Sequence, residues 1–237
     1  MNADQALLRK HVEHYNRTLS SENRTARTSL FVANSSGRCR YSPSRAEQAT
    51  IHSDVARASA LLKPYRRLHR IPWKFVFVDT ACDVENNFPH THAHTIFLPS
   101  MYFSMSTQQR VKLLIHEKTH VFQRYYPIPY IKIVRHHLGY AVHGYLPSHP
   151  DFARTRANPD TNDIIYSRDR TYVLPILDEG ASRLSDVRVV RYSAETDRRA
   201  PNGGPGYKAE HPNEALAYYL EDRVPKRAVS PEIAALL

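Results

Sequence analysis

The chain has little cysteine and little glycine, and these shortages exclude several classes of protein. Its two cysteines, Cys39 and Cys82, form neither a disulfide framework nor a metal-binding motif, which indicates a reducing compartment. Seven glycines set against sixteen prolines argue against a Rossmann-type phosphate loop. No stretch reaches the ~20 apolar residues that cross a bilayer, and residues 1–10 lack the apolar core of a signal peptide. We therefore expect a cytoplasmic or virion-associated protein that is neither secreted nor held in a membrane.

Positive charge is what the chain has in excess. Lysine and arginine number 33 against 23 acidic residues, which gives a net charge of +10, and 14 histidines could add to it in acid. Such a balance suits weak association with a polyanion. The basic residues are nevertheless scattered and match no nucleic-acid-binding motif, so a solvated basic surface is the simpler interpretation.

The length bounds the domain organisation. At 237 residues the chain can bury the core of one domain. We divide it into a helical N-terminal region, residues 1–70, and a region that holds the motifs described below, residues 71–237. The alternative is one continuous domain over residues 1–237.

Two capping boxes mark the clearest predicted helices. One helix opens at Ser44 with Glu47 and runs to about Leu62, and the other opens at Ser106 with Gln109 and ends near Tyr126, before Pro127. The other predicted elements are helices over 3–19, 179–190 and 211–222, strands over 74–78, 94–98 and 172–177, and loops over 146–170 and 192–207. Residues 128–145 show no clear period. Too few strands alternate with helices for a doubly wound sheet, so we predict an α+β fold, mainly helical with a small β-sheet.

The second capped helix contains the pattern HExxH, in the segment His116-Glu117-Lys118-Thr119-His120. Histidines four residues apart lie on one helical face, so both imidazoles can reach a single metal ion. Zinc lowers the pKa of a bound water to about 7, and Glu117, beside the first ligand, could then serve as a general base. The alternative is a pair of surface histidines on an amphipathic helix.

A catalytic zinc takes three protein ligands and leaves one position open, so a third ligand is needed. Glu214 is the best candidate, because it lies in the first turn of the late helix beside the small residues Ala215 and Ala217, which permit close packing on the motif helix. The alternative is an acidic residue that stabilises the helix N-terminus. Rival ligands are His143, Asp160, Asp163, Glu179 and His211. On the same helix, Glu221→Ala is expected to do little.

Three further histidines, His90, His92 and His94, alternate along one segment and would point to one face of a strand. They could form a separate metal site. We prefer the interpretation that they line the rim of a cleft or face solvent.

With these residues, the chain resembles the gluzincin branch of zinc metallopeptidases, on the HExxH segment followed downstream by Asn213-Glu214. More closely, it resembles poorly characterised HExxH proteins of large DNA viruses and some microbes. The shared segments are Pro89-His90-Thr91, residues 116–124, Asn158-Pro159-Asp160 and Glu210-His211-Pro212-Asn213-Glu214. The resemblance implies that residues 71–237 form a zincin-like metallopeptidase domain, with zinc ligands His116, His120 and Glu214 and with Glu117 as the base.

The chain departs from that family in two respects. Between His120 and Glu214 lie 93 residues, positions 121 to 213, which is a long insertion. At the fourth position after Glu214, where an acidic residue usually supports the first histidine, stands Tyr218; Asp178 or Asp160 could supply that support instead. The candidates for stabilising an oxyanion are Tyr166, Tyr218, His143 and His211, and we assign Tyr218 to the catalytic residues with Glu117.

The sequence therefore predicts a zinc-dependent peptidase that uses metal-activated water on a peptide or protein substrate, which would add as a strand to residues 94–98. One alternative is a zincin-fold structural or virion-associated protein that keeps its metal without proteolysis. Another is a nucleic-acid-binding or nuclease function, although the chain lacks the Asp/Glu cluster that a two-metal nuclease needs.

Overall fold

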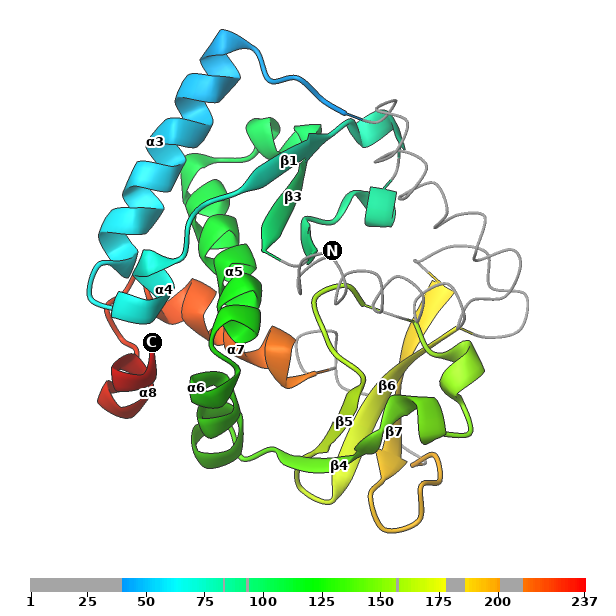
Figure 1. Ribbon diagram of the computed structural model, residues 1–237. Helices are drawn as coiled ribbons and strands as arrows, with labels where there is room; N and C mark the ends of the chain where they lie inside the picture. Colours follow the sequence, from blue (N-terminus) through cyan, green and yellow to red (C-terminus); the bar gives the residue numbers. More distant parts are fainter. Residues whose placement is uncertain (1–39, 83, 93, 157, 178–185, 201–210) are drawn as a thin grey trace, which may run out of the picture.

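The computed structural model describes residues 40–237 apart from residues 83, 93, 157, 178–185 and 201–210 (Figure 1). The helix predicted over residues 3–19 lies outside this part. The α-helices are α3 (Arg45–Leu62), α4 (Arg66–Arg70), α5 (Thr107–Tyr125), α6 (Pro127–Lys132), α7 (Pro212–Arg223) and α8 (Pro231–Leu236). A π-helical turn, Ile133–His137, continues α6, and short 3-10 turns cover Thr80–Cys82, Val84–Asn87, Ser100–Ser104, Leu146–Ser148 and Phe152–Arg154.

Both predicted capping boxes are confirmed. Ser44 Oγ accepts from the backbone N–H of Glu47, whose carboxylate accepts from the N–H of Ser44 at 2.8 Å. Ser106 and Gln109 repeat the arrangement at the start of α5, with Oε1 of Gln109 2.9 Å from the N atom of Ser106. Pro127 then ends α5 and opens α6, because proline has no N–H to continue a helix but fits its first turn.

The first sheet has three strands in the order β1-β3-β2. Strand β1 (Phe75–Val78) runs parallel to β3 (Thr95–Pro99), and β2 (His90–His92) runs antiparallel to β3 on its other side. The two strands predicted over 74–78 and 94–98 are confirmed. However, β3 is the central strand, so a substrate cannot add to residues 94–98, and that expectation is wrong.

The remaining strands form two antiparallel pairs, β4 (Ala141–Tyr145) with β5 (Ile164–Ser167) and β6 (Thr171–Leu177) with β7 (Val187–Ser193). The strand predicted over 172–177 is confirmed. The helix predicted over 179–190 is wrong for residues 187–190, which belong to β7; its other described residue, Asp186, precedes that strand, and residues 179–185 lie outside the described part. The loop predicted over 146–170 contains β5 and is wrong there.

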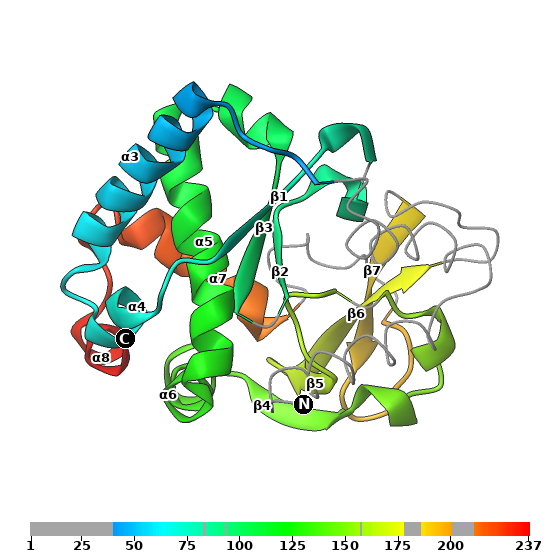
Figure 2. The same cartoon turned by 45° about the horizontal axis from the view of Figure 1, so that its top comes forward.

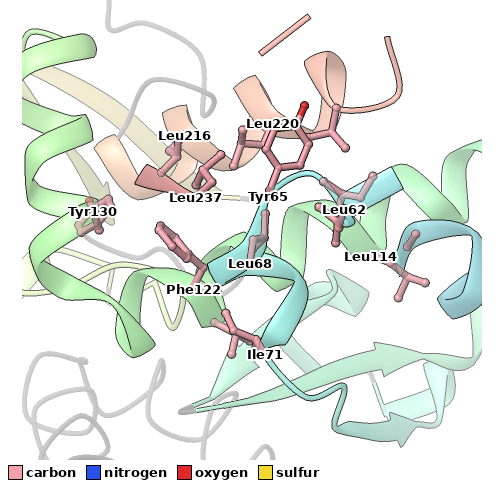
Figure 3. Packing of buried hydrophobic residues seen from close by; sticks show 14 of the residues in the cluster. Leu62, Tyr65, Leu68, Ile71, Leu114, Phe122, Tyr130, Leu216, Leu220 and Leu237 are labelled. Atoms are coloured by element: carbon pink, nitrogen blue, oxygen red, sulfur yellow. The ribbon is translucent and has the colours of Figure 1, made fainter. Parts of the chain in front are cut away.

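Helix α5 lies between α3 on one side and the three-stranded sheet on the other (Figure 1, Figure 2). Its apolar side chains meet those of α3, α4, α7 and the C-terminus in the main core (Figure 3). Buried members of this core are Leu62, Leu68, Leu114, Phe122, Leu216, Leu220 and Leu237. A smaller core of Ile165, Tyr172, Leu174, Ile176 and Tyr192 lies among β5, β6 and β7. The helices and small sheets confirm the predicted α+β fold, and no helix of the described residues has the length and apolar character to cross a bilayer.

Candidate metal centre

The HExxH segment lies on the buried side of α5, where this helix packs against α7. His116, Glu117 and His120 are 7%, 2% and 1% exposed. The centroids of the two imidazole rings are 4.8 Å apart, as expected for histidines one helical turn apart on one face. The surface-histidine alternative is therefore wrong, because both rings face the interior.

Helix α7 brings Glu214 to these histidines. The Oε2 atom of Glu214 lies 3.5 Å from Nε2 of His116 and 3.8 Å from Nε2 of His120. Two ligand atoms that each lie ~2.0–2.1 Å from a tetrahedral ion are about 3.3 Å apart, so the observed spacing is close to the one a zinc ion requires. The approach is possible because Leu216 and Ala217 pack α7 tightly into the core, with no exposed surface.

The outer nitrogen of His116 is held by a second carboxylate of α7. Nδ1 of His116 donates to Oε2 of Glu221 at 3.0 Å, which turns Nε2 toward Glu214. Burial lowers the pKa of His116, but hydrogen bonds to Glu214 and Glu221 outweigh it and raise that pKa to about 10. A carboxylate behind a ligating histidine fixes the orientation of the ring and increases its basicity.

His120 and Glu214 are held in the same way. Oε1 of Gln123 lies 3.2 Å from Nδ1 of His120, and the amide of Gln123 donates to the carbonyl oxygen of Asn213. Burial lowers the pKa of His120, and its Nε2 atom is buried without a hydrogen-bond partner. Asn158 Nδ2 donates to Oε1 of Glu214 at 3.2 Å, which leaves Oε2 turned toward the imidazoles. An unpartnered buried nitrogen beside a carboxylate is what a metal ion would satisfy.

Glu214 has the electrostatics of an ionised ligand. Burial alone would raise the pKa of its carboxyl group, but His120 and His116 lower it to about 2. For Glu117, burial raises the pKa well above its ordinary value, and the nearby carboxylate of Asp160 raises it further. Oε2 of Glu117 has no hydrogen-bond partner within the described structure. The two glutamates therefore differ: Glu214 is held by partners on both oxygens, whereas Glu117 keeps one oxygen uncommitted.

A cleft of about 500 Å³ opens beside this group. Its walls include α5, α7 and the segments before β2 and β5. The polar side chains that line it with His116 include Glu117, Asn158, Asp160, Glu214 and Glu221, and the lining also contains Tyr218, His90, Phe88 and Leu113. Glu117 and two of the candidate ligands, His116 and Glu214, thus line one cleft, whereas His120 lies buried behind it.

A second group of metal-ligating atoms uses His120 in a different combination, with Glu117 and Asp160. Oδ1 of Asp160, however, already accepts from the N–H and the hydroxyl group of Thr91 at 2.8 and 2.5 Å, and Arg124 lies 3.9 Å away. These hydrogen bonds and the positive charge of Arg124 stabilise the Asp160 carboxylate without a metal. The group of His116, His120 and Glu214 is therefore the better site.

The structure also separates the other oxyanion candidates from the cleft. Tyr218 lines it, with its ring centroid 4.6 Å from that of His116. Nε2 of His143 bonds to Asp197 at 2.7 Å, while His211 caps the start of α7 and packs against Tyr166. Of the four candidates only Tyr218 is placed to contact a substrate near the metal group.

The rival third ligands are placed as follows. His143 and His211 have the partners just described, and Asp163 belongs to neither group of ligating atoms found in the described residues. Glu179, a rival ligand, lies outside those residues, and so does Asp178, a candidate support for His116. Glu221 takes the supporting role, which the sequence did not assign to it, although its position seven residues after Glu214 places both on one face of α7.

The histidines of β2 do not form a separate metal site with a third ligand in the described chain. His90 is buried in the cleft wall, where its ring stacks on that of Phe97 at 5.1 Å. His94 packs on Tyr125 instead. The backbone N–H of Thr91, between His90 and His92, points away from β3 and is bound by Asp160.

Lys118, on another side of α5, is buried and ties the motif helix to the start of the sheet. Its Nζ donates to the carbonyl oxygen of Ile71 at 2.7 Å and lies 3.7 Å from the ring centre of Trp73. Burial lowers the pKa of Lys118 to about 7. Lys118 therefore anchors the helix and does not face the cleft.

Glu221→Ala is now expected to weaken zinc binding by about 10- to 100-fold, because His116 loses the group that orients it. The sequence alone predicts little effect, and that prediction is wrong if this contact orients His116. Asp222→Ala is a matched control: it removes the same charge from the adjacent position, where the side chain is exposed and pairs with Lys226. Competition with a chromophoric chelator measures both affinities. Equal zinc affinities in the two variants would contradict the supporting role of Glu221.

Comparison of the chain with models of protein families, with curated proteins and with solved structures finds no match. The resemblance to gluzincins therefore stays a prediction that rests on the motif residues.

Proposed function

We propose that the chain is a zinc-dependent peptidase that hydrolyses peptide bonds. The observation that supports this most is the convergence of His116 Nε2, His120 Nε2 and Glu214 Oε2 beside the uncommitted carboxylate of Glu117. Two imidazoles and one carboxylate are a donor set that suits Zn²⁺ and leaves a position open. The bound metal would supply an acidified water and polarise the substrate carbonyl.

In this proposal, the residues of the cleft divide the remaining work. Glu117 takes a proton from the attacking water and delivers it to the leaving amine, for which its unpartnered Oε2 is suited. The phenol of Tyr218 donates to the developing oxyanion. Glu221, Gln123 and Asn158 hold the three ligands in position.

Substrate recognition falls to side chains of the cleft rather than to strand addition. Strand β3 is central in its sheet and therefore offers no free edge to a substrate. On β2, the outward N–H of Thr91 already donates to Asp160. Phe88, Leu113 and Tyr218 provide apolar contacts along the cleft. We infer a short stretch of peptide with an apolar side chain near the scissile bond.

A protein that keeps its metal for stability alone is the alternative function. A purely structural site has no use for a buried carboxylate with an uncommitted oxygen, since such a group costs stability. The position of Glu117 therefore favours catalysis over the structural role.

The first test is metal content. The chain purified without chelator is expected to hold about one zinc ion, and His116→Ala or His120→Ala to abolish binding, because either change removes a ligand. Plasma emission spectroscopy on all three proteins, with a screen of fluorogenic peptides on the same samples, gives the result. His136→Ala, an exposed histidine outside the cleft, is the control. Unchanged zinc content in both His116→Ala and His120→Ala would show that these histidines are not metal ligands.

A further inference from the structure

Exposed apolar side chains are concentrated in one segment of the chain. Among the described residues, seven large hydrophobic side chains are exposed, and five of them fall within residues 125–145. These five are Tyr125, Ile128, Ile131, Val142 and Tyr145. Ile128 is 69% exposed and Val142 is 61% exposed, so neither side chain belongs to the core. Such clustering marks an interaction surface.

The segment consists of the end of α5, then α6 with its π-helical continuation, and β4. Both α6 and β4 lie along the lower side of the molecule in both views (Figure 1, Figure 2). Along the helical part, Ile128, Ile131 and Arg135 recur at helical spacing, so they share one face with Lys132. We call the exposed side chains of residues 125–145 the docking face.

The docking face is cationic as well as apolar. Lys132, Arg135, His136 and His137 are all exposed, and the sequence contains no acidic residue between Glu117 and Asp151. Near β4 the charge is mixed, because Arg168 pairs with Asp169 at 3.6 Å and Asp197 lies 2.7 Å from His143, so the unpaired positive charge belongs to the helical part of the segment. The partner should therefore carry negative charge and accept aliphatic side chains.

These two requirements discriminate among partners. A second copy of the chain, with a net charge of +10, would bring like charge to the contact. A nucleic acid meets the charge requirement, but isoleucine side chains neither stack on bases nor bind phosphates. The surface of an anionic bilayer meets both, because aliphatic side chains enter the acyl boundary, cations bind lipid phosphates, and tyrosine favours the interface between them.

We propose that the docking face binds the surface of an anionic lipid bilayer. Ile128 and Ile131 insert below the headgroups, and Lys132 and Arg135 contact the lipid phosphates. The chain lies on the bilayer without crossing it, and the cleft residues take no part in the contact.

Vesicle flotation of the full chain tests the proposal. Binding is expected with vesicles of phosphatidylcholine mixed with phosphatidylglycerol, and not with phosphatidylcholine alone. The double variant Ile128→Ser/Ile131→Ser should lower the partition coefficient at least about tenfold, because two aliphatic side chains no longer enter the lipid. Lys132→Ala/Arg135→Ala should lower it by a similar factor, and about 1 M salt should weaken binding of the unchanged chain.

Matched controls separate the docking face from the rest of the surface. Met101→Ser removes an exposed apolar side chain elsewhere, and Lys63→Ala/Arg66→Ala removes two exposed charges near α4; both should bind as the unchanged chain does. Circular dichroism and zinc content verify that each variant is folded. Equal binding to both kinds of vesicle overturns the proposal. Binding that depends on Lys132 and Arg135 but not on Ile128 and Ile131 also overturns it, and assigns the face to a polyanion such as DNA.

Discussion

Glu117→Gln is expected to retain zinc and fold while it loses peptide hydrolysis by about a thousandfold or more, because glutamine cannot take the proton of the attacking water. The substitution keeps the shape of the side chain and removes only its ability to ionise. Since Glu117 is 2% exposed, the neutral amide should leave the melting temperature unchanged or raise it. Initial rates on a cleaved fluorogenic peptide, zinc content and thermal melting are the three measurements.

Glu232→Gln is the control, because it neutralises an exposed glutamate in α8. Full hydrolytic activity in Glu117→Gln would show that Glu117 is not the base. Loss of zinc in that variant would instead make Glu117 a ligand and favour the group that it forms with His120 and Asp160.

Glu214→Ala is expected to weaken zinc binding by at least about a hundredfold, more than any change to the residues that support the ligands. The substitution removes the atom that lies within 4 Å of both Nε2 atoms, and leaves His116 with Glu221 as its carboxylate partner. Zinc titration against a chelator of known affinity measures the effect.

Asp160→Asn is the comparison that makes this experiment decisive. Asparagine keeps an oxygen that accepts from Thr91, so the local structure around Arg124 should survive. If Glu214→Ala binds zinc normally and Asp160→Asn does not, the metal belongs to the second group and the gluzincin resemblance fails.

Local chemistry explains which parts of the fold could be predicted. Each capping box joins a helix start to a side chain three residues away, and Pro127 ends a helix by its own covalent structure. The spacing of His116 and His120 likewise places both rings on one face of any helix. These predictions did not depend on which parts of the chain meet in space.

The predictions that were wrong concern contacts between parts of the chain that are distant in sequence, which only the folded structure determines. Residues 187–190 contain three valines and form a strand because they pair with residues 174–177 of β6. Strand β2 has only three residues, too few to show a period, yet it makes β3 central and removes the expected substrate edge. The role of Glu221 depends on how α7 crosses α5, which places a residue two turns beyond Glu214 against His116.

Helices α5 and α7, which meet at the metal group, are joined by a long segment of chain that contains β4, β5, β6 and β7. A metal held by His120 on α5 and Glu214 on α7 would link the two ends of that segment through coordination bonds in the folded chain. Because the folded chain would bind the metal and the unfolded chain would not, binding would stabilise the whole fold, including the small core among β5, β6 and β7. The ion would then stabilise the fold as well as take part in the reaction.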